Sequence, residues 1–378
     1  MSLVLDEHRQ YLADTARLDA FDAALRAAVQ PGDVVLDLAS GTGILGLLAC
    51  RAGARRVYAI EMGPIVELAR ELARANGFSD RIIAIHELSS RARLPEPVDL
   101  IVTDAAGRFG FDGGIIELLS DARRRFLKPG GRIIPQDLTL TIAPVDAREP
   151  ASHVAFWNTP LRGLSLTPAL NIARSTGYPR HLDVSELLAS PADVIVINPS
   201  VAIGSMSGTA SFTASRAGTV SGIGGWFSAR LAPGVTLTNA PGAPQRINRR
   251  NVFLPLRVPT PVDAGDTIRV SLFIVPASLI VRWTVEIIAD TGTTRHRTDA
   301  STFEGMLISR EEMSRARPGF QPTLTPAGRG RKTVLDLCDG VRPLADIELL
   351  VLERHPDLFD DLSEAAAFVA EVVTRYSA

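Results

Sequence analysis

The stretch that decides the fold is VVLDLASGTGILG, residues 34–46. Its apolar run leads into Gly41, Gly43 and Gly46, which have the G-x-G-x-x-G spacing of a loop that joins a strand to a helix and binds a nucleotide. Further strand-like runs alternate with amphipathic helical text as far as about residue 145; these are RVYAIE (56–61), RIIAIHE (81–87), DLIVTDA (99–105) and GRIIPQ (131–136). The alternation predicts a Rossmann-like, doubly wound parallel sheet of the α/β class.

Asp37 stands four residues before the first glycine and discriminates between cofactors. In an open parallel sheet the ligand lies at the carboxyl ends of the strands, so residues 37–43 must form the mouth of the first strand. A dinucleotide would bring a pyrophosphate there, and the Asp37 carboxylate would repel it. S-adenosylmethionine brings a sulfonium and an ammonium, which a carboxylate attracts. The loop therefore predicts S-adenosylmethionine and not NAD. Glu61, at the end of the second strand, can accept hydrogen bonds from both ribose hydroxyls of either cofactor.

The text changes character after Thr139. Segments such as SGTASFTAS (207–215) and RRNVFLPLRV (249–258) are short, β-branched and punctuated by Gly, Pro and Asn, which is typical of an antiparallel sandwich or barrel. A stretch rich in Pro, Gly and Arg follows and predicts a linker, and the last residues read as three helices. We predict N-terminal helices over 1–30, a cofactor-binding domain over 31–145, a barrel over 146–300, a linker over 301–331 and a small helical domain over 332–378.

Composition narrows the class of protein. The chain has 378 residues, 46% of them apolar, and a formal net charge of −2, which gives no electrostatic reason to expect nucleic acid or an anionic membrane as a partner. The two cysteines, Cys50 and Cys338, lie far apart, so we expect neither a disulfide nor a metal site. The start of the chain lacks the apolar run of a secretion signal, and the most apolar stretch, 270–283, is interrupted by Pro276 and Arg282. We therefore expect a cytoplasmic protein.

Several segments resemble a known family. VVLDLASGTGILGLLACRAGARRVYAIE (34–61) resembles the first two motifs of class I methyltransferases, and specifically those of the protein arginine methyltransferase family. The spacing of His8, Leu12, Asp14, Arg17 and Phe21 is similar to the family's cofactor-covering helix. Residues 154–160 and 249–275 resemble segments of its barrel. The likeness covers about residues 4–290. It implies a methyltransferase that uses S-adenosylmethionine and has a barrel for substrate binding and dimerisation. It also implies that the protein is a homodimer.

The resemblance also implies roles for individual residues. Arg17 would pair with the methionine carboxylate, Asp37 and Gly41 would line the amino end, and Ser89 or Ser90 would contact adenine. The complete expected cofactor set is Arg17, Asp37, Ala39, Gly41, Thr42, Gly43, Glu61, Met62, Ser89, Ser90 and Asp104. From the residues alone, Asp14 and Arg17 could instead form an ordinary pair on a helix surface.

The acceptor site departs from the family pattern. The resemblance implies two glutamates that hold a guanidinium on the loop after the fourth strand, here TDAAGRFGFDGG (103–114). Asp104 takes the first place, but the second falls on Gly113, with Asp112 beside it. The family's Thr-His-Trp signature is replaced by about Arg246-Ile247-Asn248, so Asp14 loses the histidine that would pair with it. A guanidinium needs bidentate recognition, so a smaller acceptor such as an amine is predicted.

We predict four catalytic residues, namely Asp104, Asp112, His8 and Asp14. His8 could act as a base, or it could be structural or merely exposed. Asp112 could contact the substrate, or it could cap the following helix.

The last segment resembles a PqqD-like, winged-helix peptide-recognition domain. The likeness rests on TVLDLCDGVRPLADIELLVLERHP (333–356) and on the helix that carries Phe368. Such a domain binds the leader segments of ribosomally made peptides. A helical element that packs on the barrel or forms a dimer contact fits the same text.

The favoured function is therefore N-methylation of an amine on a peptide, a ribosomally made natural-product precursor. The alternatives are methylation of a small natural-product amine or hydroxyl, a divergent protein arginine methyltransferase, and a catalytically weak binding module that keeps the cofactor fold.

Overall fold

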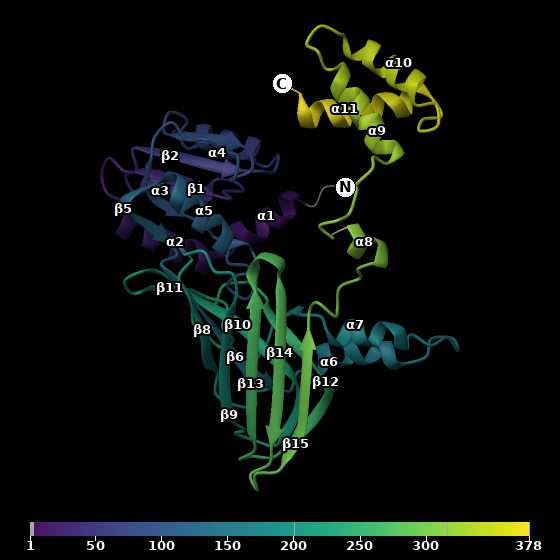
Figure 1. Ribbon diagram of the computed structural model, residues 1–378. Coiled ribbons are helices and arrows are strands. Elements are labelled where there is room, and N and C mark those ends of the chain that lie inside the picture. Colours follow the sequence, from purple (N-terminus) through teal and green to yellow (C-terminus); the bar gives the residue numbers. More distant parts are fainter. Residues whose placement is uncertain (1–3, 200, 316, 378) are drawn as a thin grey trace. The chain divides into compact units, whose positions relative to one another are not determined.

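The computed structural model describes residues 4–199, 201–315 and 317–377. It divides into two compact units, Met1–Met306 and Leu307–Ala378. The first unit contains a parallel sheet and two antiparallel sheets, and the second is helical (Figure 1). None of the helices in the described residues has both the length and the apolar character required to cross a membrane.

The parallel sheet confirms the predicted α/β class. Its strands lie in the order β3-β2-β1-β4-β5, and every neighbouring pair is parallel. All five residues of β1 are buried, as expected for an apolar strand covered on both faces. The strands are β1 (Val34–Leu38), β2 (Arg56–Glu61), β3 (Ile82–His86), β4 (Val98–Val102) and β5 (Leu127–Ile134). The helices that accompany them are α1 (Val4–Leu12), α2 (Thr15–Ala28), α3 (Ile44–Arg51), α4 (Val66–Ala75) and α5 (Ile115–Phe126).

The strand order reverses between β1 and β4. Connections from β1 lead to one side of the sheet through β2 and β3, and β4 and β5 lie on the other side. At such a switch point the loops that follow the two central strands diverge and leave a crevice for a ligand. The loop after β1 begins at Ala39, and the loop after β4 carries Asp104. The topology thus brings the two predicted site loops together.

Antiparallel sheets make up the rest of the first unit. A six-stranded sheet has the order β7-β12-β10-β6-β8, with β11 paired to β10, and a four-stranded sheet has the order β15-β14-β13-β9. The first consists of β6 (Asp137–Val145), β7 (Tyr178–Arg180), β8 (Ala192–Ile197), β10 (Gly218–Ala232), β11 (Val235–Thr238) and β12 (Asn251–Val262). The second consists of β9 (Met206–Thr213), β13 (Thr267–Val275), β14 (Ile280–Ile288) and β15 (Thr294–Ser301).

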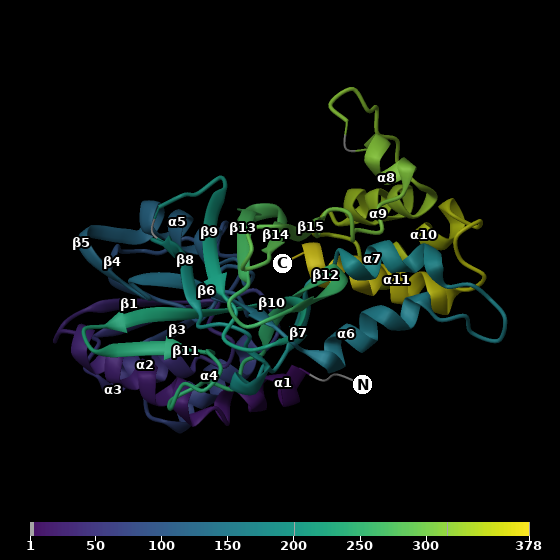
Figure 2. The same cartoon turned by 90° about the horizontal axis from the view of Figure 1, so that it is seen from below.

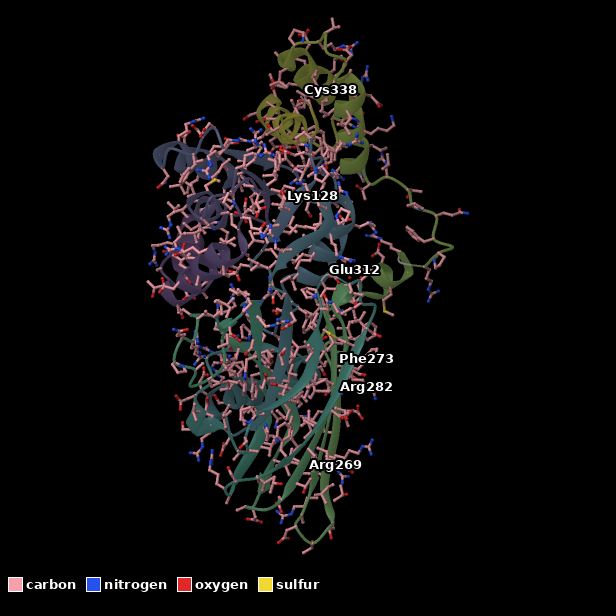
Figure 3. The ribbon with its side chains drawn as sticks, turned by 90° about the vertical axis from the view of Figure 1, so that its left-hand side faces the viewer. Lys128, Arg269, Phe273, Arg282, Glu312 and Cys338 are labelled. Carbon is pink, nitrogen blue, oxygen red and sulfur yellow. The ribbon has the colours of Figure 1, made fainter. Side chains whose placement is uncertain are left out.

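The four-stranded sheet has one buried and one exposed face. Buried residues alternate with exposed ones along β13 and β14, which is the period of a strand with one face on the core. Figure 3 labels Phe273, Arg282 and Arg269 on the exposed face of this sheet. On the buried face, Trp283 is fully enclosed and donates its indole N–H to the Pro255 carbonyl at 3.0 Å.

A helical hairpin extends from the antiparallel sheets in both ribbon views (Figure 1, Figure 2). It consists of α6 (Arg148–Ala155), η1 (Phe156–Asn158), η2 (Thr167–Ala169) and α7 (Leu170–Arg174), and we call residues 148–174 the arm. Its apolar residues Phe156, Trp157, Leu161 and Leu164 are exposed, Leu164 at 70%. Two further short helices, η3 (Val184–Glu186) and η4 (Pro276–Ser278), lie in loops.

The second unit has its own hydrophobic core. Its helices are α8 (Arg310–Arg315), α9 (Pro326–Leu337), α10 (Leu344–Arg354) and α11 (Leu362–Tyr376). The core residues are Val334, Leu337, Ile347, Val351, Phe359, Ala365, Val369 and Val372. Helix α9 begins at Pro326, inside the predicted linker over 301–331. It begins there because the Thr325 side chain caps the helix by accepting a hydrogen bond from the Gly328 amide, and because Pro326 is well suited to a first turn.

The strands of a winged helix are absent from residues 307–315 and 317–377. The segment that could have supplied them, FQPTLTP (320–326), contains Pro322 and Pro326, which lack the amide donors that a sheet ladder requires. The predicted helices are therefore present in the described part of this unit, whereas the predicted wing is not.

Candidate functional site

A cavity of about 930 Å³ opens at the switch point of the parallel sheet. Five parts of the first unit line it, namely α1 with the start of α2, the loop after β1, the loop after β4, His181 after β7, and residues 248–250 before β12. Eight of the predicted site residues line this cavity: His8, Asp14, Arg17, Ala39, Gly41, Thr42, Asp104 and Asp112.

The centre of the site is Asp104, which two arginines share. Its Oδ2 accepts a hydrogen bond from Arg17 Nε at 2.5 Å and from Arg249 Nη2 at 2.8 Å. The three side chains are 7–11% exposed. Burial by itself would raise the pKa of Asp104, but Arg249 and Arg17 outweigh it and hold that pKa below its ordinary value. Asp104 is therefore a carboxylate at neutral pH. Its other oxygen, Oδ1, is buried and has no hydrogen-bond partner.

Tyr11 covers the two arginines. The guanidinium carbons of Arg17 and Arg249 lie 5.9 and 6.0 Å from the centre of its ring, within the range of cation–π contact. The Tyr11 carbonyl also accepts a hydrogen bond from Arg17 Nη1 at 3.3 Å. Helix α1 is thus joined to the charged centre through a residue that the sequence analysis did not select.

The loop after β1 has the features that the cofactor requires. Ala39, Gly41 and Gly43 all have positive φ, at 58°, 54° and 73°, so the backbone turns sharply without bulky side chains. Glu61 fixes this turn, since its carboxylate accepts hydrogen bonds from the Gly41 amide at 2.9 Å and the Gly63 amide at 2.7 Å. The bare glycines leave room for a ligand to approach the backbone closely.

Asp37 lies directly behind this loop and is fully buried. Its Oδ2 accepts a hydrogen bond from the Gly46 amide at 2.8 Å, and its Oδ1 has no partner. Burial raises the pKa of Asp37 from its ordinary value to about 7. A buried carboxylate with a free oxygen is poorly solvated, so a cation would stabilise its charged form. Asp37 has the charge that the ammonium of S-adenosylmethionine requires, and Arg17 has the charge that its carboxylate requires; these two roles stay predictions.

His8 and Asp14 connect the N-terminal helices to the site. A Cβ atom added to Gly41 would lie 2.9 Å from His8 Cε1, so the imidazole lies over the glycine loop. The two oxygens of Asp14 accept hydrogen bonds from backbone amides, Oδ1 from Arg17 at 3.2 Å and Oδ2 from Asn248 at 2.7 Å. Asp14 therefore joins α2 to the barrel segment where the family pattern would have a histidine.

The loop after β4 has no space for a side chain at position 113. Asp112 Oδ1 accepts hydrogen bonds from the amides of Arg108 and Phe109, at 2.7 and 2.8 Å, and so closes the loop on itself. The alternative that Asp112 caps α5 is wrong, because the cap residue is Gly114 and no side chain binds there. A Cβ atom on Gly113 would lie 2.2 Å from the Ala105 carbonyl oxygen, a contact that backbone atoms cannot relieve.

Phe109 fixes the same loop to the barrel. Its ring is buried, and a Cβ atom added to Gly225 of β10 would lie 2.7 Å from its Cε2. The ring therefore packs directly on the backbone of a glycine. The acceptor loop and the central strand of the six-stranded sheet form one packed element.

The remaining predicted cofactor residues do not line the cavity. They are Asp37, Gly43, Glu61, Met62, Ser89 and Ser90. Glu61 at the end of β2 is paired in register with His86 at the end of β3, so the last four lie on or just after neighbouring strands. Their roles in binding the nucleoside stay predictions.

Sequence reasoning missed Arg249, His181, Asn239 and Asn251. Asn239 is fully buried, and its Nδ2 donates to the carbonyls of Arg108 and Arg250 at 2.8 and 3.0 Å. Asn251, also fully buried, donates to the Asn239 carbonyl at 2.7 Å. His181 lines the cavity, and burial together with Arg246 and Arg250 lowers its pKa. In the sequence, the segment RINRRN (246–251) could have indicated Arg249 and Asn251, because it places a cluster of arginines and asparagines at the start of a strand.

No group of three or more His, Cys, Asp or Glu residues in the described chain is arranged to hold a metal ion.

Comparisons with known proteins agree with this geometry. A family model described as ribosomal protein L11 methyltransferase (PrmA) matches residues 18–136. The chain is 31% identical over 275 residues to an arginine N(omega)-methyltransferase of Streptomyces achromogenes subsp. streptozoticus, in an alignment that covers 70% of this chain and 75% of the relative. The chain belongs to the arginine methyltransferase family. The predicted methyltransferase class and the predicted cofactor, S-adenosylmethionine, are thereby confirmed.

Other members of the arginine methyltransferase family match over shorter spans. The chain is 32% identical over 174 residues to the probable protein arginine N-methyltransferase 6 of Arabidopsis thaliana, over 45% of this chain and 40% of that protein. It spans 40–56% of the length of the plant and frog relatives that it matches in this way. The solved Trypanosoma brucei PRMT1 enzyme–prozyme heterotetrameric complex with AdoHcy has a TM-score of 0.71 and 20% identity, over 78% of this chain and 97% of that one. At this identity the likeness shows a shared fold.

The raised pKa of Asp37 predicts that cofactor binding depends on pH. Below about pH 7 Asp37 is protonated in the cofactor-free protein, and it must lose its proton to pair with the cofactor ammonium. Affinity should therefore rise about tenfold per pH unit between about pH 5.5 and 7 and then level off, with release of a proton in the lower range. Isothermal calorimetry in buffers of different ionisation enthalpy measures both quantities. Asp37→Asn should remove the dependence, and an affinity of the unmodified protein that is constant over this range would contradict the assignment.

Proposed function

We propose that this protein transfers a methyl group to an uncharged amine nitrogen of a peptide, a ribosomally made precursor, in the cytoplasm. The observation that carries this proposal is the state of Asp104. One of its oxygens is held by Arg17 and Arg249, and the other is buried without a partner beside the cofactor loop. An acceptor N–H that donates to Oδ1 would fill this vacant hydrogen-bond position and orient the nitrogen lone pair away from the carboxylate.

The charges around Asp104 favour an unprotonated nitrogen. S-adenosylmethionine, when bound, supplies an electrophilic methyl group on its sulfonium. The attacking nitrogen must carry a free lone pair, so an ammonium has to lose its proton first. Arg249 and Arg17 disfavour a third cation at this place and so lower the pKa of an amine brought against Oδ1. The nitrogen–carbon bond then forms as the carbon–sulfur bond breaks, and the nitrogen's proton leaves to water.

Arginine methylation is the second candidate function. The similarity to the arginine N(omega)-methyltransferase of Streptomyces supports it, as does the similarity to protein arginine N-methyltransferase 6 of plant and frog. Two features argue against it, namely the absence of room for a side chain at Gly113 and the engagement of Asp104 with the protein's own arginines. Methylation of a small natural-product amine would use the same geometry without a peptide.

The first experiment measures turnover on matched acceptors. The purified protein is incubated with labelled S-adenosylmethionine and one of two peptides, and the products are analysed by mass spectrometry. The peptides differ in one residue, which carries an amine in one peptide and is arginine in the other. We expect the methyl group on the amine peptide. Asp104→Asn keeps the shape of the side chain but removes its charge, and should reduce kcat about 100-fold or more while leaving cofactor affinity unchanged or higher. Efficient formation of methylarginine by the unmodified protein would support the second candidate instead.

We further propose that the second unit binds the leader part of the peptide. It has an independent core, and it exposes apolar residues that its own core does not use, namely Leu335, Val341, Leu344 and Leu349. Contacts remote from the reacting group raise the effective concentration of the acceptor. A unit that only packs on another surface would also need exposed apolar residues. Kinetic measurements are therefore needed to distinguish leader binding from a packing role.

Deletion of residues 307–378 distinguishes leader binding from a packing role. For leader recognition, the Michaelis constant for a leader-bearing peptide should rise at least about tenfold, and that for the same acceptor without a leader should not change. A thermal melt of the shortened protein shows whether the first unit stays folded. An intact melt with equal losses on both peptides, or with no loss on either, would exclude leader recognition by this unit.

We also propose that the arm forms a homodimer contact. Two of its exposed apolar residues, Phe156 and Trp157, lie on η1, and the other two, Leu161 and Leu164, lie in the turn that follows; a monomer would leave all four in water. Leu164→Glu should convert the dimer to a monomer in light scattering. Val196→Glu is a matched control, because Val196 on β8 is also 70% exposed but lies outside the arm. A monomeric unmodified protein, or a dimer that both variants retain, would contradict this contact.

A further inference from the structure

We propose that Arg249 is a built-in guanidinium that occupies the acceptor carboxylate and restricts the enzyme to uncharged acceptors. This inference rests on the proposed function, since it names the feature that selects the acceptor class. The resemblance to arginine methyltransferases implies that the carboxylate at position 104 receives the guanidinium of a substrate. In this chain the protein's own guanidinium is bound there.

The contacts of Arg249 are those expected of a permanently bound guanidinium. Nη2 donates to Asp104 Oδ2 at 2.8 Å, and Nη1 donates to the Gly107 carbonyl at 3.2 Å. Both acceptors belong to the loop after β4. The Tyr11 ring covers the group from helix α1 at 6.0 Å, and the side chain is 11% exposed. A carboxylate, a backbone carbonyl and an aromatic ring thus hold one cation on different sides.

The backbone on either side of Arg249 is fixed as well. The Asn248 amide donates to Asp14 Oδ2 at 2.7 Å, which binds this segment to α2. The Arg250 carbonyl accepts a hydrogen bond from Asn239 Nδ2 at 3.0 Å, and the same amide group holds the Arg108 carbonyl of the acceptor loop. These anchors fix the backbone from which the Arg249 side chain reaches Asp104. Its place on Asp104 is therefore part of the folded structure.

The two guanidinium groups in contact with Asp104 disfavour a further cation at that carboxylate. Asp104 already neutralises one of two guanidinium groups that touch it, and Arg108 and Arg250 also line the cavity. Of the four other acids that line the cavity, Asp14 accepts hydrogen bonds from the amides of Arg17 and Asn248, and Asp112 from those of Arg108 and Phe109. Asp6 and Glu7 lie on α1, where Asp6 accepts hydrogen bonds from Arg9 and Gln10. A guanidinium or ammonium substrate would have to displace Arg249 or bind beside it against like charge. An uncharged nitrogen needs only the free Oδ1.

Removal of Arg249 should therefore create a site for an external guanidinium. In Arg249→Ala, Asp104 Oδ2 loses one of its two donors, Oδ1 stays without a partner, and the removed side chain leaves space for one planar cation. We expect methylguanidine and N-acetyl-L-arginine methylamide to bind this variant at least about tenfold more tightly than the unmodified protein in calorimetry. S-adenosylhomocysteine is kept at saturating concentration so that the cofactor pocket stays closed. Methylguanidine should also raise the Tm of Arg249→Ala.

Arg108→Ala is the matched control, because Arg108 lines the same cavity but lies half exposed, 3.8 Å from Asp112. It should gain no guanidinium binding and no methylguanidine-dependent rise in Tm. If Arg249→Ala does not fold, Arg249→Gln removes the charge but keeps a donor for Asp104, and it should show the same gain at smaller size. Equal guanidinium binding by the unmodified protein and the Arg249 variants would overturn the inference.

The outcome is independent of whether the unmodified protein methylates amines. If it turns over no amine peptide but Arg249→Ala gains guanidinium binding, the proposed function fails and the role of Arg249 stands. If amine turnover is found without that gain, the proposed function stands and the acceptor class is set by another feature.

Discussion

The ion pairs of Asp104 with Arg17 and Arg249 hold together three parts of the chain that are far apart in sequence. Arg17 comes from α2, Asp104 from the loop after β4, and Arg249 from the segment before β12. Loss of Asp104 would leave two buried guanidinium groups without compensation, at a cost of about 3–5 kcal/mol. This penalty makes the relative position of the parallel sheet and the barrel depend on the same groups that surround the acceptor. Stability and substrate choice therefore rest on shared side chains.

Local sequence patterns were sufficient to predict the parallel sheet and the cofactor. A buried apolar strand followed by glycines at positive φ is encoded within residues 34–43, and Asp37 on this strand was the residue that favoured a cationic cofactor. The antiparallel sheets followed from short β-branched segments punctuated by Gly, Pro and Asn. Such features depend on neighbours in sequence, so a single chain contains enough information to infer them.

The acceptor end could be predicted only in part. Asp104 was identified, but its arginine partner Arg249 lies 145 positions away, and nothing in the pattern of either segment encodes that pairing. Asp112 was predicted as a catalytic or capping residue, whereas its oxygen closes the acceptor loop, because two amides in that loop lie nearer than the helix end. The predicted wing in the second unit failed for a local reason that the sequence did contain, the prolines at 322 and 326. Contacts between distant segments are decided by packing, which no window of sequence can reveal.

The packing of Phe109 on Gly225 limits the ways in which this site can change. An ancestor or engineered variant with a second acid at position 113 would need a different path for the Ala105 carbonyl, and that path is tied to Asp112, to Phe109 and, through them, to the glycine strand of the barrel. Single substitutions that convert an amine-specific site into a guanidinium-specific site, or the reverse, should therefore be disfavoured. Each intermediate sequence would contain either a steric clash or an unpaired charge. Lineages with this compact loop would be expected to diversify through residues that face the open cavity, while the loop and its strand change together or remain fixed.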